Sequence, residues 1–257
     1  MKLATWNVNS LNARLPRVLE FLDAHAPDLV FLQETKTEPD AFPAGALAAA
    51  GYEAVHHSAG RWAGVALLAR SGSALEEVCH GLAGEPAVDE ARWIEATVGD
   101  VRAVSVYVPN GRAVGSPTFA DKLRFLEAAA ERVRELAAAG PLAVAGDFNV
   151  CPTDVDVYDP AAFAGSTHVT PDERSRFAAI LDAGVVDAYR AVHPEPEVGF
   201  TWWDYRQGHF HRKLGLRIDA ILLTPPLAER LEECGIDRGF RKGPKPSDHA
   251  PLLATLR

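Results

Sequence analysis

The chain has 257 residues, of which 47% are hydrophobic and 24% charged, with a formal net charge of −9. This globular composition is compatible with one domain spanning residues 1–257, and no apolar run reaches the ~18 residues that a membrane span needs. The acidic balance argues against nucleic-acid binding through bulk positive charge, although it leaves room for a local basic groove. The three cysteines lie far apart and a strand-like segment begins at Lys2, so we expect no disulfide framework, no signal peptide and a cytoplasmic location.

The first third of the chain predicts a strand, a helix and a second strand. Residues 2–6 form a short apolar segment that is typical of a strand. Apolar residues from Leu15 to Leu22 follow the i, i+3, i+4, i+7 spacing of a helix, and we expect Pro16 in the first turn of that helix. The apolar run 29–32 then predicts a buried strand that ends at Glu34.

The middle of the chain repeats this order. Helical spacing from Leu123 to Leu136 predicts a helix that Gly140 closes. The apolar run 142–145 follows, and this predicted strand ends at Asp147. A third helix is indicated by Thr170, Pro171 and Glu173, which form an N-terminal capping box, and we expect it to end at Gly184. Further strands are predicted at residues 64–69, 93–98, 102–108, 218–223 and 252–256.

A helix followed by an apolar strand and then an acid occurs twice, which indicates an α/β protein built from two similar halves. Strands outnumber helices, and many of them are short and apolar. We therefore predict a four-layer α/β sandwich, in which two mixed β-sheets pack face to face and helices cover the outer faces.

Six polar residues stand next to predicted strands, five of them at or just after an apolar run and His249 just before the last one, which suggests one polar site at the rim of a sheet. Glu34 is a candidate ligand for a hard divalent cation, since such ions prefer carboxylate oxygens, or else a solvated charge at a strand end. The carbonyl oxygen of Asn7 is a second candidate ligand, or a turn residue. The six residues are Asn7, Glu34, Asp147, Asn149, Asp219 and His249.

The run from Gly146 to Asn149 is the strongest local signal. Strand alternation would point the side chains of Asp147 and Asn149 the same way. Asp147 is then a candidate for deprotonating a water molecule, and Asn149 for donating a hydrogen bond to charge on a phosphate oxygen. The alternative is an ordinary turn between a strand and a loop.

The run Ser247-Asp248-His249 places an imidazole near the end of the chain, just before the last predicted strand. Asp219 opens another apolar run, where an unpaired carboxylate is costly to bury. We expect Asp219 to bind one ring nitrogen of His249, which would set its tautomer and raise its pKa. Tyr107 ends its own predicted strand and is either part of the same site or an aromatic strand residue with a solvated hydroxyl.

Nine motifs spread over nearly the whole chain resemble the exonuclease III family of Mg²⁺-dependent DNA-repair nucleases, within the endonuclease/exonuclease/phosphatase superfamily. The motifs around Asp147 and His249 fit the whole superfamily, whereas those beginning at Thr201 and Gly215 are specific to the nuclease branch. The motifs are Thr5-Trp6-Asn7-Val8-Asn9-Ser10 with Arg14, Leu32-Gln33-Glu34-Thr35-Lys36, Gly64-Val65-Ala66-Leu67-Leu68, Tyr107-Val108-Pro109-Asn110-Gly111, Gly146-Asp147-Phe148-Asn149-Val150, Pro152-Thr153-Asp154, Thr201-Trp202-Trp203-Asp204-Tyr205-Arg206, Gly215-Leu216-Arg217-Ile218-Asp219 and Lys245-Pro246-Ser247-Asp248-His249-Ala250-Pro251.

The resemblance implies a DNase I-like fold and a role for each polar residue. Glu34 would be the principal ligand of Mg²⁺, or of Mn²⁺, with Asn7 beside it and Asp248 near the metal or the leaving group. Asp147 would hold the attacking water. The roles of the others follow: Asn149 and Tyr107 would brace the scissile phosphate, and His249, oriented by Asp219, would bind a phosphate oxygen.

The loop that begins at Trp202 is rich in aromatic and basic residues. Taken alone, its aromatic residues predict positions in the hydrophobic core. The resemblance instead implies that Trp202 lines a pocket for an extrahelical abasic sugar. Nearby cations are candidates for gripping DNA phosphates, and a solvated basic surface is the alternative. The candidate DNA contacts are Trp202, Arg206, Arg212, Lys213, Arg217 and Lys245, with Arg241 and Lys242 also considered.

The resemblance implies AP endonuclease, 3′-phosphodiesterase and 3′→5′ exonuclease activities on double-stranded DNA carrying abasic sites or damaged 3′ ends, by a monomer. The segment 154–169, which contains Tyr158 and His168, departs from better-known members and leaves the balance among these activities open. Two alternatives remain: a phosphatase of the same superfamily that acts on phosphomonoesters such as phosphoinositides, and a non-catalytic DNA-binding relative.

Overall fold

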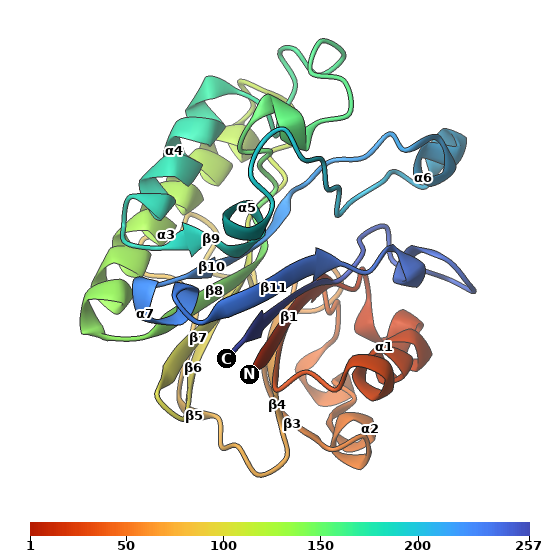
Figure 1. Cartoon of the computed structure of the whole chain (residues 1–257), viewed down its shortest axis with the longest axis vertical. Helices are drawn as coiled ribbons and strands as arrows, with labels where there is room; N and C mark the ends of the chain where they lie inside the picture. Colours follow the sequence, from red (N-terminus) through yellow and green to blue (C-terminus); the bar gives the residue numbers. More distant parts are fainter.

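Two six-stranded mixed β-sheets pack face to face in the computed structural model, which describes residues 1–257 (Figure 1). In spatial order the first sheet consists of β11 (Leu231–Ile236), β12 (Leu252–Leu256), β1 (Lys2–Asn7), β2 (Leu29–Gln33), β4 (Val65–Arg70) and β3 (Tyr52–His57). The second consists of β5 (Glu76–His80), β6 (Trp93–Val98), β7 (Val101–Tyr107), β8 (Leu142–Asp147), β10 (Asp219–Leu223) and β9 (Val186–Asp187).

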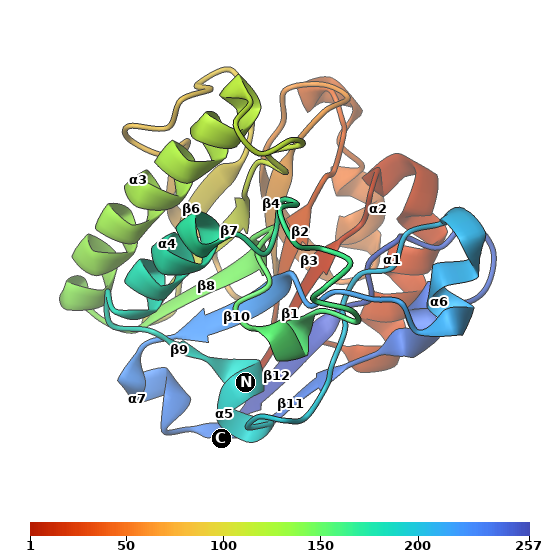
Figure 2. The ribbon, with the colours of Figure 1, turned by 90° about the horizontal axis from the view of Figure 1, so that it is seen from above.

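Helices cover the outer face of each sheet, which confirms the predicted four-layer α/β sandwich (Figure 2). The first sheet is covered by α1 (Leu11–His25) and α2 (Ala44–Ala49), and the second by α3 (Pro117–Ala139) and α4 (Pro171–Leu181). No helix is both long and apolar enough to span a bilayer. The shorter helices are α5 (Ala188–Val192), α6 (His209–Arg212) and α7 (Pro225–Ala228), and the 3₁₀ turns are η1 (Pro39–Ala41), η2 (Asp154–Asp156), η3 (Arg206–Gly208) and η4 (Arg238–Arg241).

The central strands are apolar on both faces because each face packs against a different layer. In β2, Leu29 and Phe31 point into the core between the two sheets, whereas Val30 and Leu32 pack under α1 and α2. The same alternation along β8 sends Ala145 inward and Val144 toward α3 and α4. Side chains alternate along a strand, so such a run reads as continuously hydrophobic.

The predictions are correct for the end of α3 and the start of α4 but not for the end of α4 or the start of α1. Gly140 is the C-cap of α3, and Thr170 with Glu173 forms the complete capping box of α4, although that helix ends at Leu181, before Gly184. The prediction for α1 was wrong. This helix begins at Leu11 behind the cap Ser10, so Pro16 lies inside it rather than in its first turn.

Two βαβ units give the fold its two halves and gather strand ends at one edge. The strand β1 runs parallel to β2 and is joined to it through α1, and β7 runs parallel to β8 and is joined to it through α3. Because both strands of each unit point the same way, their carboxyl ends lie at one edge of their sheet. In these two units, the predicted acids Glu34 and Asp147 lie at those ends.

Candidate active site

The polar strand ends of the two sheets meet in a single cluster. In the second sheet Tyr107, Asp147 and Asp219 are neighbours across β7, β8 and β10, since Asp147 is in register with both of the others. In the first sheet Asn7 is in register with Gln33, the residue before Glu34. The structure thus brings together residues that lie far apart in the sequence.

Asn7 joins the two halves of the cluster. Its Nδ2 donates to Glu34 Oε1 at 2.8 Å and to Asp147 Oδ2 at 2.9 Å, while its Oδ1 accepts from the backbone N–H of Asn9. Asn7 therefore presents its amide nitrogen to the carboxylates, not the carbonyl oxygen expected of a metal ligand. In this arrangement it holds the carboxylates of Glu34 and Asp147 side by side.

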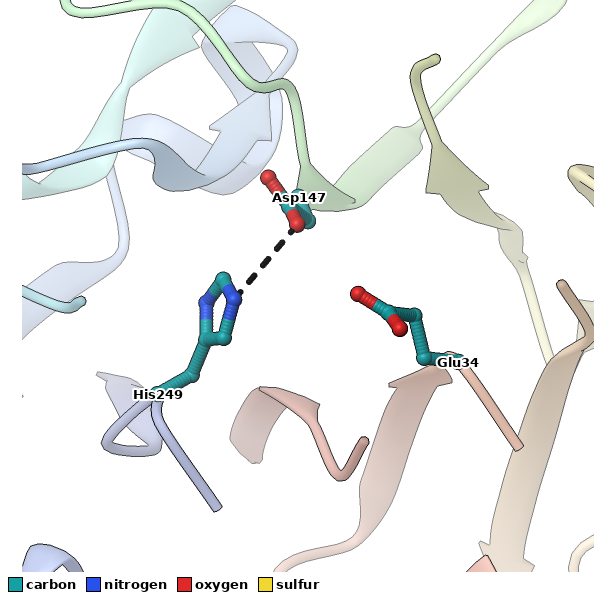
Figure 3. Close-up of side chains that lie close together, drawn as sticks. All are labelled: Glu34, Asp147 and His249. Carbon is teal, nitrogen blue, oxygen red and sulfur yellow. Dashed lines mark ion pairs between the residues drawn. The ribbon is translucent and has the colours of Figure 1, made fainter. Parts of the chain in front are cut away.

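Asp147 lies between Glu34 and His249 (Figure 3). Its Oδ2 is 3.7 Å from His249 Nε2, and its Oδ1 accepts from the backbone N–H of Asn149 at 2.9 Å. Burial raises the pKa of Asp147 to about 7, with the carboxylates of Asp219 and Glu34 adding to the rise and His249 opposing it. A carboxylate with such a pKa is suited to exchanging a proton at neutral pH.

His249 and Asp219 form the pair that was predicted. His249 Nδ1 is 2.9 Å from Asp219 Oδ2, and both side chains are buried. Burial lowers the pKa of His249, but Asp219 and Asp147 outweigh it and raise that pKa to about 10. The imidazole is therefore a cation at neutral pH, with Nε2 facing the cluster.

Tyr107 and Lys36 flank Glu34. Lys36 Nζ pairs with Glu34 Oε2 at 2.6 Å, and it also donates to Asn9. Burial, followed by the carboxylate of Glu34, raises the pKa of Tyr107 well above its usual value. Its hydroxyl is therefore protonated at neutral pH and available as a hydrogen-bond donor.

Asn149 lies in a turn after β8, so strand alternation does not explain its position in the cluster. The strand β8 ends at Asp147, and Asn149 adopts a left-handed backbone conformation with φ of 52°. Its Nδ2 donates to the carbonyl of Val108 at 2.9 Å, and its Oδ1 accepts from Asn110 Nδ2 at 3.3 Å. Asn149 is placed near Asp147, as predicted, but a turn rather than alternation puts it there.

Asp248 is not part of the Glu34, Asp147 and His249 group. One of its oxygens accepts from Asn9 Nδ2 and the other from Trp202 Nε1, each at 3.0 Å. Trp202 also forms an isolated β-bridge with His249. The carboxylate of Asp248 is thus engaged by Asn9 and Trp202, and this geometry does not favour its expected role as a metal ligand.

The predicted basic DNA contacts divide into exposed and buried residues. Arg206 is 84% exposed and forms an ion pair with Asp204. Arg241, considered as a phosphate contact, is buried and donates to the carbonyl of Trp203. The other exposed members of the set are Arg212, Lys213 and Lys245, and Lys242, which was also considered, is exposed as well.

Arg217 was predicted wrongly as a DNA contact. Its side chain is 1% exposed, and its guanidinium pairs with Asp156 at 2.6 Å and with Asp187 at 2.7 Å. These acids belong to η2 and β9, so Arg217 fastens the segment after β8 to the edge of the second sheet. A basic residue beside a catalytic motif is as suited to such a buried pair as to a phosphate.

Replacing Arg217 with methionine is expected to lower the free energy of unfolding by about 3–5 kcal/mol, since it leaves buried carboxylates without their partner. Urea unfolding followed by circular dichroism would measure this. Arg206→Met is the matched control, because its exposed ion pair contributes little. Unchanged stability of Arg217→Met together with weaker DNA binding would restore the original prediction.

The donor set suits a hard divalent cation. The oxygens of Glu34 and Asp147 and a ring nitrogen of His249 lie within 4.8 Å of one another. Protonated His249 is no ligand, so the carboxylates are the ligands that this group offers, and Mg²⁺ and Mn²⁺ prefer such oxygens. Asp219 Oδ1, next to this group, is buried without a hydrogen-bond partner.

Several polar residues of the site were not predicted as such. Asn9 and Lys36 connect Glu34 to Asp248, and Ser247 Oγ donates to the carbonyl of Asn7 at 2.6 Å. Asn110 binds the side chain of Asn149. Lys36 and Asn110 each follow a predicted strand by a few residues, so the strand-end rule that selected Glu34 would have found them if extended along the loop.

Comparison with known proteins gives the same result over nearly the whole chain. Residues 4–249 match the endonuclease/exonuclease/phosphatase family. Exodeoxyribonuclease III of Haemophilus influenzae is 30% identical over all of both chains. The structure of the 3′ phosphatase NExo from Neisseria, bound to a product DNA hairpin, is 42% identical with a TM-score of 0.96.

An AP endonuclease from Archaeoglobus fulgidus is 39% identical with a TM-score of 0.94, and like the Neisseria structure it aligns over 100% of this chain and 99% of its own. The similarity therefore includes every strand end that contributes to the cluster. The chain belongs to the endonuclease/exonuclease/phosphatase family and, within it, to the exonuclease III family of DNA-repair nucleases.

Proposed function

We propose that this protein is a Mg²⁺-dependent DNA-repair nuclease that hydrolyses phosphate esters at abasic sites and at damaged 3′ ends of double-stranded DNA. The observation that carries the proposal is the buried cluster in which Asp147 lies between Glu34 and the His249–Asp219 pair. The relatives add support, because they include an exodeoxyribonuclease III, a 3′ phosphatase and an AP endonuclease.

The residues of the cluster divide the work of hydrolysis. Asp147, with its pKa near 7, accepts the proton of the attacking water as the water oxygen bonds to phosphorus. The P–O bond to the leaving oxygen breaks, and that oxygen takes up a proton from solvent. The cationic His249 donates from Nε2 to a phosphate oxygen, and Asn149 and Tyr107 donate hydrogen bonds to the same group. A divalent cation held by Glu34 would supply Lewis-acid stabilisation of the negative charge on the phosphate.

The surroundings of the cluster are better suited to a nucleic-acid substrate than to a small-molecule substrate. Trp202 lies against His249 and Asp248, and exposed Arg206, Arg212 and Lys213 follow it in the same loop. Cations at the rim bind the backbone of either strand without reading sequence. One chain supplies every residue of the cluster, which supports action as a monomer.

A duplex assay tests the proposal. Wild-type protein is incubated with a duplex containing one abasic site and, separately, with a duplex ending in a 3′-phosphate, each with Mg²⁺ and with EDTA. We expect cleavage on the 5′ side of the abasic site and release of inorganic phosphate from the 3′ end, both abolished by EDTA and restored by excess Mg²⁺ or Mn²⁺.

The same assay separates the alternatives. Phosphate release from inositol phosphates, with both DNA substrates left intact, would support a phosphatase instead. DNA binding without turnover in Mg²⁺ or Mn²⁺ would indicate a non-catalytic relative. The ratio of the two DNA activities would place the enzyme nearer to the 3′ phosphatase or to the AP endonuclease among its relatives.

A further inference from the structure

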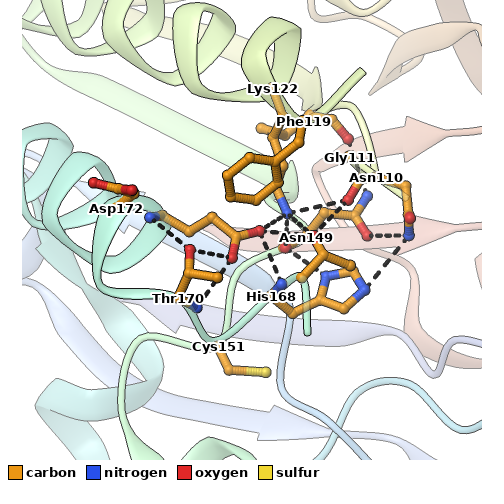
Figure 4. Close-up of polar contacts among 12 residues, drawn as sticks. Asn110, Gly111, Phe119, Lys122, Asn149, Cys151, His168, Thr170 and Asp172 are labelled. Atoms are coloured by element: carbon orange, nitrogen blue, oxygen red, sulfur yellow. Dashed lines mark hydrogen bonds and ion pairs between the residues drawn. The ribbon is translucent and has the colours of Figure 1, made fainter. Parts of the chain in front are cut away.

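A buried lysine lies beneath the two asparagines of the site (Figure 4). Lys122, on α3, is 0% exposed, and its Nζ donates to the carbonyl of Asn149 at 2.6 Å and to that of Asn110 at 3.2 Å. It also donates to Thr167 Oγ1 at 3.2 Å and forms an ion pair with Glu173 of α4. One ammonium therefore connects the loops after β7 and β8 to the start of α4.

Such a pair is not explained by stability alone. Lys122 and Glu173 are both fully buried, and the cost of removing two charges from water often cancels their attraction. A well-packed apolar pair would stabilise the fold as well or better. What the lysine adds is a set of directed hydrogen bonds to the loops that carry Asn110 and Asn149.

These bonds hold Asn149 in a conformation that the residue alone would not favour. Its backbone is left-handed, its N–H is taken by Asp147, and its carbonyl accepts from both Lys122 Nζ and His168 Nδ1, the latter at 2.6 Å. A non-glycine residue in this region costs free energy that its surroundings must offset. On this fixed backbone the side-chain amide of Asn149 is held in turn by Val108 and Asn110, the first accepting from Nδ2 and the second donating to Oδ1.

Gly111 shows how closely the lysine fits the loop after β7. The residue has a positive φ of 85°, and a Cβ there would lie 2.9 Å from Lys122 Cδ. A side chain at this position would displace the lysine stem or the loop. The loop that carries Asn110 is therefore shaped around Lys122.

We propose that Lys122 is a positioning residue, which acts on the phosphate through Asn149 without contacting the substrate. This rests on the proposed function, in which Asn149 donates a hydrogen bond to the phosphate. Loss of the ammonium would leave the carbonyl of Asn149 held by His168 alone and that of Asn110 by Thr167 alone, so both loops could shift. A displacement on the order of 1 Å at a binding group is enough to slow a reaction by about 10²-fold.

Three variants separate positioning from folding. Lys122→Met leaves Glu173 buried without its partner, so we expect a lower thermal unfolding midpoint and a kcat on duplex DNA reduced by roughly 10- to 100-fold with little change in KM. Lys122→Met/Glu173→Gln removes both charges while keeping a capping-box residue, and should recover most of the midpoint but not kcat. Arg132→Met, on the same helix and paired with buried Glu95, is the control that should lose stability without losing kcat.

A double-mutant cycle then asks whether Lys122 acts through Asn149. In an Asn149→Ala background, Lys122→Met should change kcat by less than about twofold, since the group that it positions is absent. An equal loss of kcat in both backgrounds would overturn the proposal, as would full kcat in Lys122→Met or recovery of kcat together with stability in the double variant.

Failure of this inference is distinguishable from failure of the proposed function. If wild-type protein cleaves no DNA, the proposed function fails before the cycle begins. If Asn149→Ala keeps wild-type kcat, the role of Asn149 is wrong, and with it the route assigned to Lys122. If both of those controls behave as expected, the cycle tests Lys122 alone.

Discussion

Replacing Asp147 with asparagine is expected to lower kcat on duplex DNA by ~10²-fold or more while the protein stays folded. Asparagine has the same shape, and its carbonyl oxygen can still accept the backbone N–H of Asn149, but it cannot accept a proton from water. The measurement is single-turnover cleavage at saturating protein and Mg²⁺, which separates the chemical step from binding.

The expected effect on stability is small, because two opposing contributions offset each other. Burial raises the pKa of Asp147 from 3.8 to about 7, so the folded state binds this proton more tightly than the unfolded state. The carboxylate therefore destabilises the fold increasingly as pH rises from about 4 to about 7, and asparagine removes that cost. Asparagine also gives up the hydrogen bond that Asp147 Oδ2 accepts from Asn7 Nδ2 and the attraction between Asp147 and His249. In EDTA at pH 8 we therefore expect urea unfolding to show a folded variant with a stability close to that of the wild type.

Asp100→Asn is the matched control, because Asp100 is exposed in the turn between β6 and β7, at the end of these strands away from Tyr107. It should change neither kcat nor stability. Near-normal cleavage by Asp147→Asn would remove Asp147 from the chemical step. A collapse in stability would instead make it a structural residue.

The sequence predicts the central strands well and the edge strands poorly. Strands β2, β8 and β10 are buried on both faces, so they read as unbroken apolar runs. The four strands that were not predicted, β3, β5, β9 and β11, are the two edges of each sheet. Edge strands are short, charged or exposed, which protects them against pairing with other chains. They therefore lack the continuous apolar run by which the central strands were predicted.

The site residues divide in a similar way. Glu34, Asp147, Asp219 and His249 were predictable because a polar residue at the end of an apolar strand is rare without a reason. The wrong prediction for Arg217 shows the limit of proximity in sequence, since burial and partners from other elements decide what a cation does. Lys122 could not be predicted as part of the site, because nothing in the sequence distinguishes it from other lysines on a helix. Only the fold places Glu173 and two loop carbonyls around it.

Replacing Asp219 with asparagine is expected to lower kcat by roughly 10²-fold at pH 8 and to move the alkaline limit of activity to lower pH. Asp219 is the strongest of the influences that raise the pKa of His249. Without the negative charge of Asp219, burial lowers the pKa of His249, so the imidazole loses its proton at a lower pH than in the wild type. The variant then lacks the cation that faces the phosphate.

The pH profile distinguishes the two roles that His249 can take. As a cationic donor with a pKa of about 10, it keeps the wild type active through pH 9, and Asp219→Asn shortens that range from the alkaline side. If His249 acted as a neutral base, wild-type activity would rise with pH up to about 10, because the imidazole must first lose its proton. Asp219→Asn would then extend activity to lower pH. The profile of kcat from pH 6 to 9.5 in saturating Mg²⁺ measures the difference. An extension toward acid would assign proton abstraction to His249 in place of Asp147, because a group that must lose its proton to work benefits when its pKa falls.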